Sequence, residues 1–357
     1  MRIPKGINRI RRKATQSLTK NIGNSAQKEY SPLPPGTTIK RILISRPNGR
    51  LGNLLLITPL LQEVTATFPD CMIDVFVKGG LAPILFKNYK NVNFVIQLPG
   101  KPFKDLFKYI GKWASIKKHR YDIAINVVKQ SSSGRLSVQF ANAKYKFFGD
   151  DATDALIDCA DYGHMAKYAV YNFRHYISQL GFAKSNKPIP LLDLKLSPDE
   201  LENGKKVLHK LTGNEKDTIC IFTYATGAKC FLPEWWDPLY NRLLLEYPDY
   251  NIIELLPKEN VSQIGFKAPT FYSMDIREMG AVLAHTKVFL GADSGIMHLA
   301  SASQTPTVGL FSGNNQKVYE PYNPGSIATN TNENGVDEII RTINNILLSY
   351  TLPPILT

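Results

Sequence analysis

The sequence predicts an α/β protein with two doubly wound, Rossmann-like domains. Three observations predict this class. Strand-like and helix-like patterns alternate in two series, residues 150–190 interrupt the alternation, and glycine-containing polar loops follow several strands. Such alternation is typical of parallel sheets that are covered by helices on both faces. The chain has 357 residues, 43% of them hydrophobic, which is enough for two cores.

The first domain is expected over residues 37–185, after a tail and linker at residues 1–36. Short apolar runs predict its strands at 41–45, 73–77, 94–98, 122–128 and 144–148. Helical spacing predicts helices at 54–68, 81–89, 103–118 and 165–180. The helix at 103–118 carries five large apolar residues on one side: Phe103, Leu106, Phe107, Ile110 and Trp113.

The second domain is expected over residues 186–349, after a turn-rich segment at 184–190. Its strands are predicted at 218–222, 250–256, 270–273, 288–292 and 307–311. Its helices are predicted at 201–211, 233–247, 276–284 and 336–348, the last of which closes the domain. Ligands of such sheets bind at the carboxyl ends of the strands, and two domains of this kind that face each other form a cleft.

Charge and cysteine usage narrow the function classes. The formal net charge is +13, and the first 20 residues contribute seven basic side chains and no acid. This basic tail is either a solubilising arm or a contact with an anionic membrane surface, and it lacks the apolar core of a secretory signal. The four cysteines are scattered, which suits a reducing cytosol and indicates no metal site. We expect Cys71 and Cys220, beside strands, to be buried.

The segment 288–300 is the strongest motif. An apolar run ends in Gly291-Ala292-Asp293-Ser294-Gly295, and an apolar helical pattern follows. The start of such a helix has unpaired amides and a partial positive charge, which favour a phosphate group. Asp293 and His298 add side chains that can orient a ligand. The alternative is that Asp293 or Ser294 only caps the helix.

Two further loops of the second domain follow strands. Thr226-Gly227-Ala228-Lys229 combines a hydroxyl, a flexible turn and a cation, a combination that suits a diphosphate. Leu256-Pro257-Lys258-Glu259 offers a carboxylate for a ribose or sugar hydroxyl. The alternatives are a solvated lysine and an ordinary exposed acid.

In the first domain the loop 45–53 joins the first strand to the first helix. Its glycines match neither G-x-G-x-x-G nor G-K-[ST], so a dinucleotide site and a P-loop are poorly supported. Arg46 and Arg50 are candidates for contact with an anionic substrate, and Asn53 lies at the helix start. The alternative is an asparagine cap beside two surface arginines.

Together these segments resemble glycosyltransferase family 9, the ADP-heptose:lipopolysaccharide heptosyltransferases and their relatives, from about Ile39 to about Leu348. Residues 291–302 resemble the family signature G-x-D-[ST]-G-x-x-H-[LI]-A-x-A. Residues 226–229 with Pro233-Glu234-Trp235 resemble the small-residue, Lys, Trp-Pro-Glu segment, with a departure around 230–232. Residues 256–259 resemble the family loop that ends in an acid, and Gly52-Asn53 with Pro59 matches its G-D-x-x-x-x-x-P pattern with one departure.

The resemblance implies the GT-B architecture and an inverting transfer of a sugar, typically heptose from ADP-heptose, to a lipopolysaccharide-core or similar lipid-linked glycan. It implies catalytic roles for Lys229, Asp293 and the position of Asn53. The implied donor-binding residues are Thr226, Gly227, Lys229, Glu259, Asp293, Ser294, Gly295, Ile296 and His298. The implied acceptor-binding residues are Arg46 and Arg50. No metal and no cofactor are expected, and no D-x-D motif is present.

The departure at Asn53 leaves the identity of the general base undetermined. The family's presumed base is the aspartate of G-D, and an amide accepts no proton at a useful pH. Asp150 or Asp151 serves instead, or deprotonation is late and Asn53 only orients the hydroxyl, or the usual acceptor is not used.

An anionic glycolipid acceptor implies a bacterial cytoplasmic enzyme at the inner face of the cytoplasmic membrane. The first domain has basic residues for such a contact: Arg46, Arg50, Lys101, Lys104, Lys108, Lys112, Lys117 and Lys118. Two alternatives remain, a transferase of this architecture that uses another nucleotide-hexose, and a nucleic-acid-binding protein. No nucleic-acid-binding motif supports the second, so no nucleic-acid partner is expected.

Overall fold

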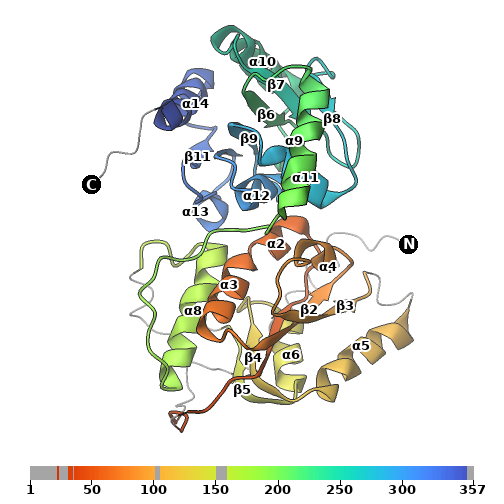
Figure 1. Cartoon of the computed structure of the whole chain (residues 1–357), viewed down its shortest axis with the longest axis vertical. Helices are drawn as coiled ribbons and strands as arrows, with labels where there is room; N and C mark the ends of the chain where they lie inside the picture. The colour runs from red at the N-terminus through yellow and green to blue at the C-terminus, as the bar shows by residue number, and fades with distance from the viewer. Residues whose placement is uncertain (1–21, 24–30, 35, 101–104, 150–158, 352–357) are drawn as a thin grey trace. The chain divides into compact units, whose positions relative to one another are not determined.

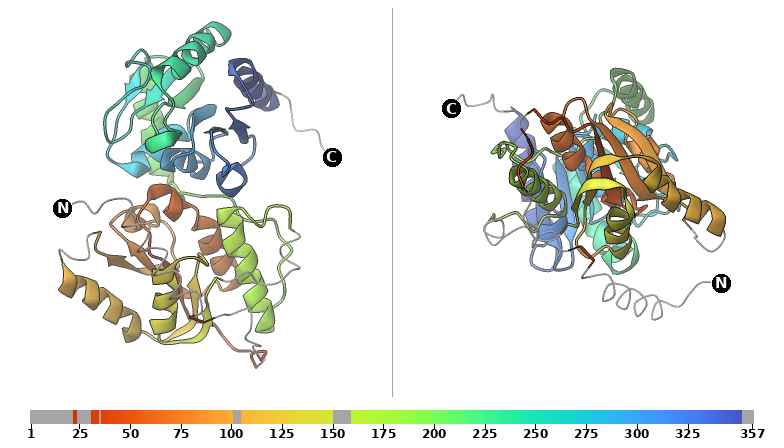
Figure 2. Two further views of the ribbon diagram at one scale, coloured as in Figure 1. Left: turned by 180° about the vertical axis from the view of Figure 1, so that it is seen from behind. Right: turned by 90° about the horizontal axis from the view of Figure 1, so that it is seen from below.

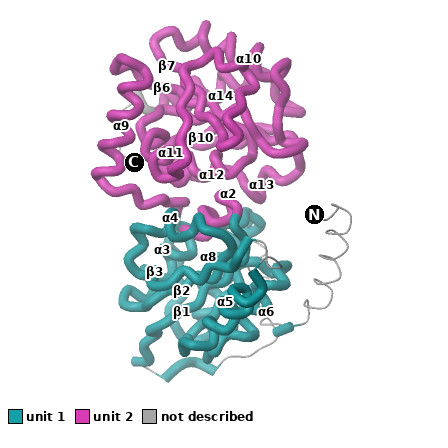
Figure 3. The backbone as a smooth tube through the Cα atoms, turned by 90° about the vertical axis from the view of Figure 1, so that its right-hand side faces the viewer, with its two compact units in different colours: residues 1–49, 59–190 teal, residues 50–58, 191–357 magenta. Residues whose placement is uncertain are grey.

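The computed structural model describes residues 22–23, 31–34, 36–100, 105–149 and 159–351. The chain forms two compact units (Figure 3). Unit 1 comprises residues 1–49 and 59–190, and unit 2 comprises residues 50–58 and 191–357. The short segment 50–58 therefore packs with unit 2, although the residues on either side of it in the chain belong to unit 1. The basic tail at residues 1–20 lies outside the described residues.

Unit 1 is built on a parallel sheet of five strands in the order β3-β2-β1-β4-β5 (Figure 1). The strands are β1 (Arg41–Arg46), β2 (Met72–Lys78), β3 (Val92–Leu98), β4 (Tyr121–Asn126) and β5 (Ala143–Phe147). The helices are α3 (Thr58–Thr67), α4 (Ala82–Leu85), α5 (Leu106–Lys118), α6 (Ser132–Phe140) and α8 (Met165–Gln179). The chain runs outward from β1 to β3 and then returns to β4 on the other side of β1, which is the doubly wound topology.

Unit 2 repeats this plan with six parallel strands in the order β11-β10-β9-β6-β7-β8. The strands are β6 (Thr218–Phe222), β7 (Asn251–Leu255), β8 (Thr270–Phe271), β9 (Val288–Ala292), β10 (Thr307–Phe311) and β11 (Ile327–Asn330). The helices are α2 (Leu51–Leu55), α9 (Pro198–Thr212), the 3-10 turn η3 (Gly227–Lys229), α10 (Pro233–Glu246), α11 (Ile276–Leu283), α12 (Gly295–Ala302), α13 (Gln316–Tyr319) and α14 (Val336–Thr351).

Both sheets are buried between helices, as the fully buried strands β6, β9 and β10 show. In unit 2 the strands pack against α10 and α14 through a core that contains Trp236, Leu239 and Ile343. The predicted fold class, α/β with two doubly wound domains, is confirmed. The two cysteines expected in cores, Cys71 and Cys220, are buried.

The single helix expected at 54–68 is two helices, α2 and α3. Pro59 has no N–H, so the carbonyl of Leu55 cannot receive the usual bond from the residue four positions on. The hydroxyl of Thr58 donates to that carbonyl instead, at 2.7 Å. The break lets α2 pack within unit 2 while α3 stays in unit 1.

Helix α5 is observed at Leu106–Lys118, and residues 101–104 lie outside the described part of the chain. Tyr109, Trp113 and Ile116 pack on the core of unit 1. The other residues expected on the side of Trp113 are exposed: Leu106, Phe107 and Ile110. The sequence therefore gives this helix two apolar sides, of which the sheet covers one.

Among the described residues, no helix has both the length and the apolar character that a bilayer crossing needs.

Candidate functional site

The candidate site lies where the strand order of unit 2 reverses. The chain leaves β6 toward β7 and β8 and then returns to β9, on the other side of β6. Because β10 follows next to β9, the loops after β6, β9 and β10 start side by side at the carboxyl edge of the sheet. Ligands of open α/β sheets bind at such a switch point.

The loop after β6 delivers Lys229 at the end of the turn η3. Gly227 begins this turn with φ +70°, a left-handed conformation that side-chain-bearing residues rarely adopt. Thr226 and Gly227 are exposed, and the side chain of Lys229 is 45% exposed. The loop therefore presents a hydroxyl and a cation at the edge of the sheet.

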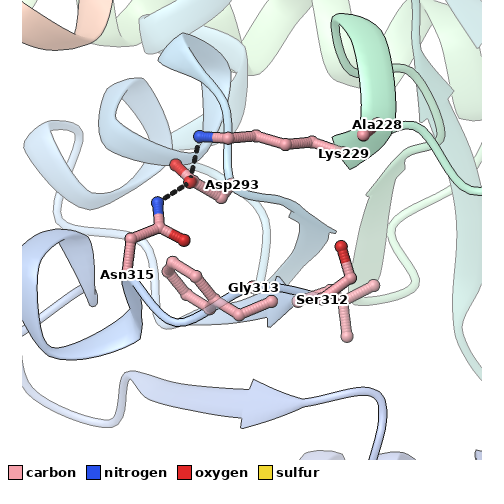
Figure 4. A pocket seen from close by; sticks show the side chains of 8 residues that line it. Ala228, Lys229, Asp293, Ser312, Gly313 and Asn315 are labelled. Carbon is pink, nitrogen blue, oxygen red and sulfur yellow. Dashed lines mark hydrogen bonds and ion pairs between the residues drawn. The ribbon is translucent and has the colours of Figure 1, made fainter.

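The loop after β9 delivers Asp293, which is buried and joins two other loops (Figure 4). Its Oδ2 accepts hydrogen bonds from Lys229 Nζ and from Asn315 Nδ2, the latter at 2.7 Å. Lys229 and Asp293 form an ion pair. Asp293 is thus tied by a cation on one side and by a neutral amide on the other.

These residues enclose a pocket of about 160 Å³. Its lining comes from the loops after β6, β9 and β10: Ala228, Lys229, Asp293, Leu310, Phe311, Ser312, Gly313 and Asn315. Pockets that enclose a drug-sized ligand have about 300–1,000 Å³. This pocket therefore suits one part of a nucleotide sugar, such as a phosphate group, rather than the whole molecule.

Helix α12 begins beside this pocket. Ser294 is its N-cap, and the Ser294 side chain accepts from the amide of Met297 at 3.2 Å. The capping alternative therefore holds for Ser294 but not for Asp293. The amides of Gly295 and Ile296, in the first turn, have no acceptor within the helix and carry its partial positive charge. Ser294, Gly295 and Ile296 are half-buried.

The start of α12 is in close contact with α2. A Cβ on Gly295 would lie 3.1 Å from Cβ of Leu51, and a Cβ on Gly52 would lie 2.6 Å from Cδ2 of His298. Only glycine at both positions allows the two helices to approach this closely. Asn53 follows Gly52 inside α2, which Arg50 begins as N-cap. Asn53 is therefore not the cap of this helix, and it lies next to the turn that contacts α12.

Aromatic contacts connect the pocket to α13. The ring of Tyr319 lies 5.9 Å from Lys229 Nζ and 6.2 Å, edge to face, from the ring of His298. His298 is buried in α12 and packs against Tyr319, and the Tyr319 ring in turn lies beside the lysine.

Two carboxylates near the carboxyl end of β7, one in the strand and one in the loop after it, differ in environment. Glu259 is 38% exposed and lies 3.8 Å from Lys258 Nζ. Glu254, at the end of β7, is fully buried, and its Oε1 accepts from Thr223 Oγ1 at 2.5 Å. Burial raises the pKa of Glu254 above its ordinary value, against the opposing effect of the Thr223 bond.

The two arginines of the first expected domain lie in different units. Arg46 ends β1 in unit 1 and is buried, whereas Arg50 is exposed and begins α2 in unit 2. Asp150 and Asp151 lie outside the described residues.

The sequence analysis missed the loop after β10, which supplies Ser312, Gly313 and Asn315. A signal was present, because Ser312-Gly313-Asn314-Asn315 is a run of turn residues directly after a buried strand. Since that strand neighbours β9, the rule for carboxyl ends would have placed this run beside Asp293.

The titratable residues give no metal site in the described part of the chain, where no group of three or more His, Cys, Asp or Glu side chains can hold an ion. The positive groups at the pocket are instead Lys229 and the start of α12.

Comparisons with known proteins identify the family of the chain. The family model described as "Glycosyltransferase family 9 (heptosyltransferase)" matches residues 112–342, more than half of the chain. The chain belongs to glycosyltransferase family 9. It is therefore a glycosyltransferase, as expected.

Similar proteins extend the family 9 match over most of the chain. The chain is 23% identical over 309 residues to lipopolysaccharide heptosyltransferase 3 of Escherichia coli. This match covers 77% of this chain and 85% of the relative. The crystal structure of the glycosyl transferase family 9 from Veillonella parvula DSM 2008 matches with a TM-score of 0.66 and 15% identity, over 87% of this chain and 98% of that one.

The structure of E. coli ADP-heptose lps heptosyltransferase II matches with a TM-score of 0.62 and 17% identity, over 88% of this chain and 100% of that one. At these identities the two solved structures support the fold, which is the GT-B architecture of family 9.

Proposed function

We propose that this family 9 protein transfers heptose from ADP-heptose to a lipopolysaccharide-core acceptor. Two of the similar proteins are named as lipopolysaccharide heptosyltransferases, and one of these names includes ADP-heptose. The observation that carries the proposal is the pocket where Lys229, Asp293 and the start of α12 meet.

The donor's diphosphate would lie against Lys229, the Thr226 hydroxyl and the amides at Gly295 and Ile296. A helix N-terminus and a lysine together favour negative charge. Asp293 would accept from a hydroxyl of the sugar, and Ser294 would keep the turn in place through its cap.

Outside the pocket, Glu259 would accept from the ribose, since its exposed carboxylate follows the next strand of the sheet. Gly227 would let the loop approach the phosphates, and His298 would support α12 from its buried side.

The reaction would be an inverting displacement. An acceptor hydroxyl oxygen forms a bond to the anomeric carbon, and the bond from that carbon to the diphosphate oxygen breaks. The bonding electron pair leaves with ADP, so negative charge grows on the leaving phosphate. Lys229 and the start of α12 would stabilise that charge without reorganising, which is why we propose that the reaction needs no metal.

The proton of the acceptor hydroxyl must reach a base. Asn53 cannot be that base, because an amide is neutral and a poor proton acceptor. We propose that Asn53 orients the hydroxyl and that deprotonation is late. Its position on α2, which contacts the start of α12, agrees with such a role.

We also propose that the protein works at the cytoplasmic face of the bacterial inner membrane. The acceptor would be an anionic lipid-linked glycan, which Arg46 and Arg50 would contact. The seven basic residues within positions 1–20 would add attraction to anionic lipid. Deletion of residues 1–30 should then weaken binding to anionic liposomes, and unchanged binding would refute the role of the tail.

The donor is tested by stabilisation and by transfer. ADP-heptose should raise the melting temperature more than UDP- or GDP-linked hexoses, because a bound donor stabilises the native state. Release of ADP should require the lipopolysaccharide-core acceptor and should persist in EDTA. A larger shift with a UDP- or GDP-hexose would refute the donor, and loss of transfer in EDTA would refute the metal-independent chemistry.

A further inference from the structure

Helix α5 of unit 1 exposes large apolar side chains that no described residue covers. Phe107 is 92% exposed, Ile110 is 55% exposed and Leu106 is 51% exposed. Helix α5 lies at the outer edge of unit 1 in the views of Figures 1 and 2. Single exposed apolar residues are ordinary, but three within one and a half helical turns form a patch that needs a partner.

The three side chains share one side of the helix. Leu106 and Ile110 are four residues apart, and Phe107 and Ile110 are three apart, so all three project in similar directions. The adjacent side is occupied, since Tyr109, Trp113 and Ile116 pack on the core of unit 1. The exposed residues are therefore not needed to hold α5 on the sheet.

Two lysines extend this apolar side. Lys117 lies seven residues after Ile110 and Lys118 lies eleven after Phe107, so both continue the same side toward the end of the helix. Lys117 Nζ lies 4.1 Å from the centre of the Phe140 ring on α6, which is itself 40% exposed. Lys108 and Lys112 lie on the opposite side of the helix, since each is two residues after a member of the patch, Leu106 or Ile110. The acid next to this surface in the sequence is Asp105, the N-cap of α5.

We infer that the surface formed by Leu106, Phe107, Ile110 and the lysines Lys117 and Lys118 binds an anionic lipid bilayer. Apolar side chains bordered by lysines are the pattern of helices that lie in a membrane interface. The apolar residues enter the boundary of the acyl chains, and the lysines remain at the headgroups, where their stems cover apolar surface.

The charge of the surface decides between a bilayer and a second protein. Lys117 and Lys118 on this surface would repel a second copy of this positively charged chain, whose net charge is +13. An anionic bilayer supplies both the apolar layer and the opposite charge. The inference deepens the proposed function, on which its membrane partner rests, but its test does not depend on sugar transfer.

The test is binding of the full-length protein to vesicles of phosphatidylethanolamine with 30% phosphatidylglycerol, compared with phosphatidylcholine vesicles, by flotation. The variant Phe107→Ser/Ile110→Ser should weaken binding to the anionic vesicles by about a hundredfold, because burial of each of the two side chains is worth about one factor of ten. Added salt should weaken the binding of the wild-type protein.

A matched control distinguishes this surface from general stickiness. Leu244 and Leu245 of α10 are 46% and 77% exposed, but α10 has a single basic residue, Arg242, that is paired with Glu246. Leu244→Ser/Leu245→Ser should bind vesicles as the wild-type protein does. Equal loss in both variants would overturn the inference, as would unchanged binding of Phe107→Ser/Ile110→Ser.

Two further readouts keep the result independent of folding and of the proposed function. A Phe107→Trp variant should show a blue-shifted tryptophan emission on addition of anionic vesicles and quenching by brominated lipid. An emission that neither shifts nor is quenched would overturn the inference.

Transfer to a deacylated, water-soluble acceptor should be the same for Phe107→Ser/Ile110→Ser and wild-type protein. If neither transfers sugar while the wild-type protein still binds vesicles, the proposed function fails and the inference stands. A concentration-dependent dimer that the double variant abolishes, with vesicle binding unchanged, would overturn it in favour of self-association.

Discussion

Replacement of Lys229 by alanine separates the stability of the pocket from its proposed chemistry. The side chain of Lys229 is 45% exposed and its partner Asp293 is 8% exposed. Exposed ion pairs are worth about 0.2–1 kcal/mol, and loss of one partner of a buried pair costs about 3–5 kcal/mol. Because Asn315 still donates to Asp293 in the variant, we expect a loss between these two ranges, about 1–2 kcal/mol.

The expected loss of activity is larger. In the proposed reaction Lys229 would meet the charge that grows on the leaving diphosphate, and removal of one such preorganised group typically lowers kcat by about 10²–10³. This factor corresponds to about 2.7–4 kcal/mol of transition-state stabilisation. The measurement is kcat/KM for ADP release with ADP-heptose and a lipopolysaccharide-core acceptor, beside the melting temperature of each variant.

Lys267 provides the matched control for Lys229. Its side chain is 50% exposed and pairs with Asp237 at 2.6 Å in the same unit, outside the pocket. Lys267→Ala should lose stability to a similar or smaller extent and keep full activity. The reasoning is refuted if Lys229→Ala keeps kcat/KM within about threefold of the wild-type value, or if Lys267→Ala loses as much.

Three further predictions concern residues around the pocket. Asn315→Ala should lower kcat/KM by about tenfold, since a buried carboxylate loses one of its donors, and Asn315→Asp should lower it further by placing two carboxylates together; equal values for the two variants would contradict this. Asn53→Ala should reduce kcat with little change in the donor's KM, and full activity in a transfer assay would remove any role for Asn53. Glu254 has a raised pKa, so its folded state loses stability as the pH rises above 4.5 toward the raised value. In urea titrations at several pH values, the free energy of unfolding of Glu254→Gln should rise relative to that of the wild-type protein by up to about 1.4 kcal/mol per pH unit in that window. A difference in unfolding free energy that does not change with pH would exclude a raised pKa.

Much of the fold could be predicted because both sheets are parallel and buried. Such strands are continuous apolar runs, as Thr218–Phe222 and Thr307–Phe311 are, and the structure places both strands at the expected residues. Short polar or weakly apolar elements were missed, namely the helix Ser132–Phe140 and the strand Ile327–Asn330. Neither has a long apolar run, and each is held by its neighbours rather than by its own pattern.

Some residues of the candidate site, such as Lys229 and Asp293, could be predicted individually, but the loop after β10 and the arrangement of the site could not. The pattern around Asp293 indicated a helix start, which α12 confirms. It contained no information on the partner of Asp293, because the contacts with Lys229 and Asn315 span 64 and 22 residues of sequence. The side of α5 that faces the sheet was also undetermined, since the helix has apolar residues on two sides and only packing selects one.

The ion pair between Lys229 and Asp293 bears on how the proposed donor would enter. A phosphate would share the ammonium group that Asp293 already holds, so we expect donor binding to loosen this ion pair. The cost is small, because the lysine is half-exposed and such pairs are worth about 1 kcal/mol. Asp293 does not lose its position when the lysine turns to the phosphate, because Asn315 still donates to the same oxygen. In the proposed reaction its other oxygen would then accept from a sugar hydroxyl, so the contact with Asn315 would let one aspartate first neutralise the lysine and then orient the sugar.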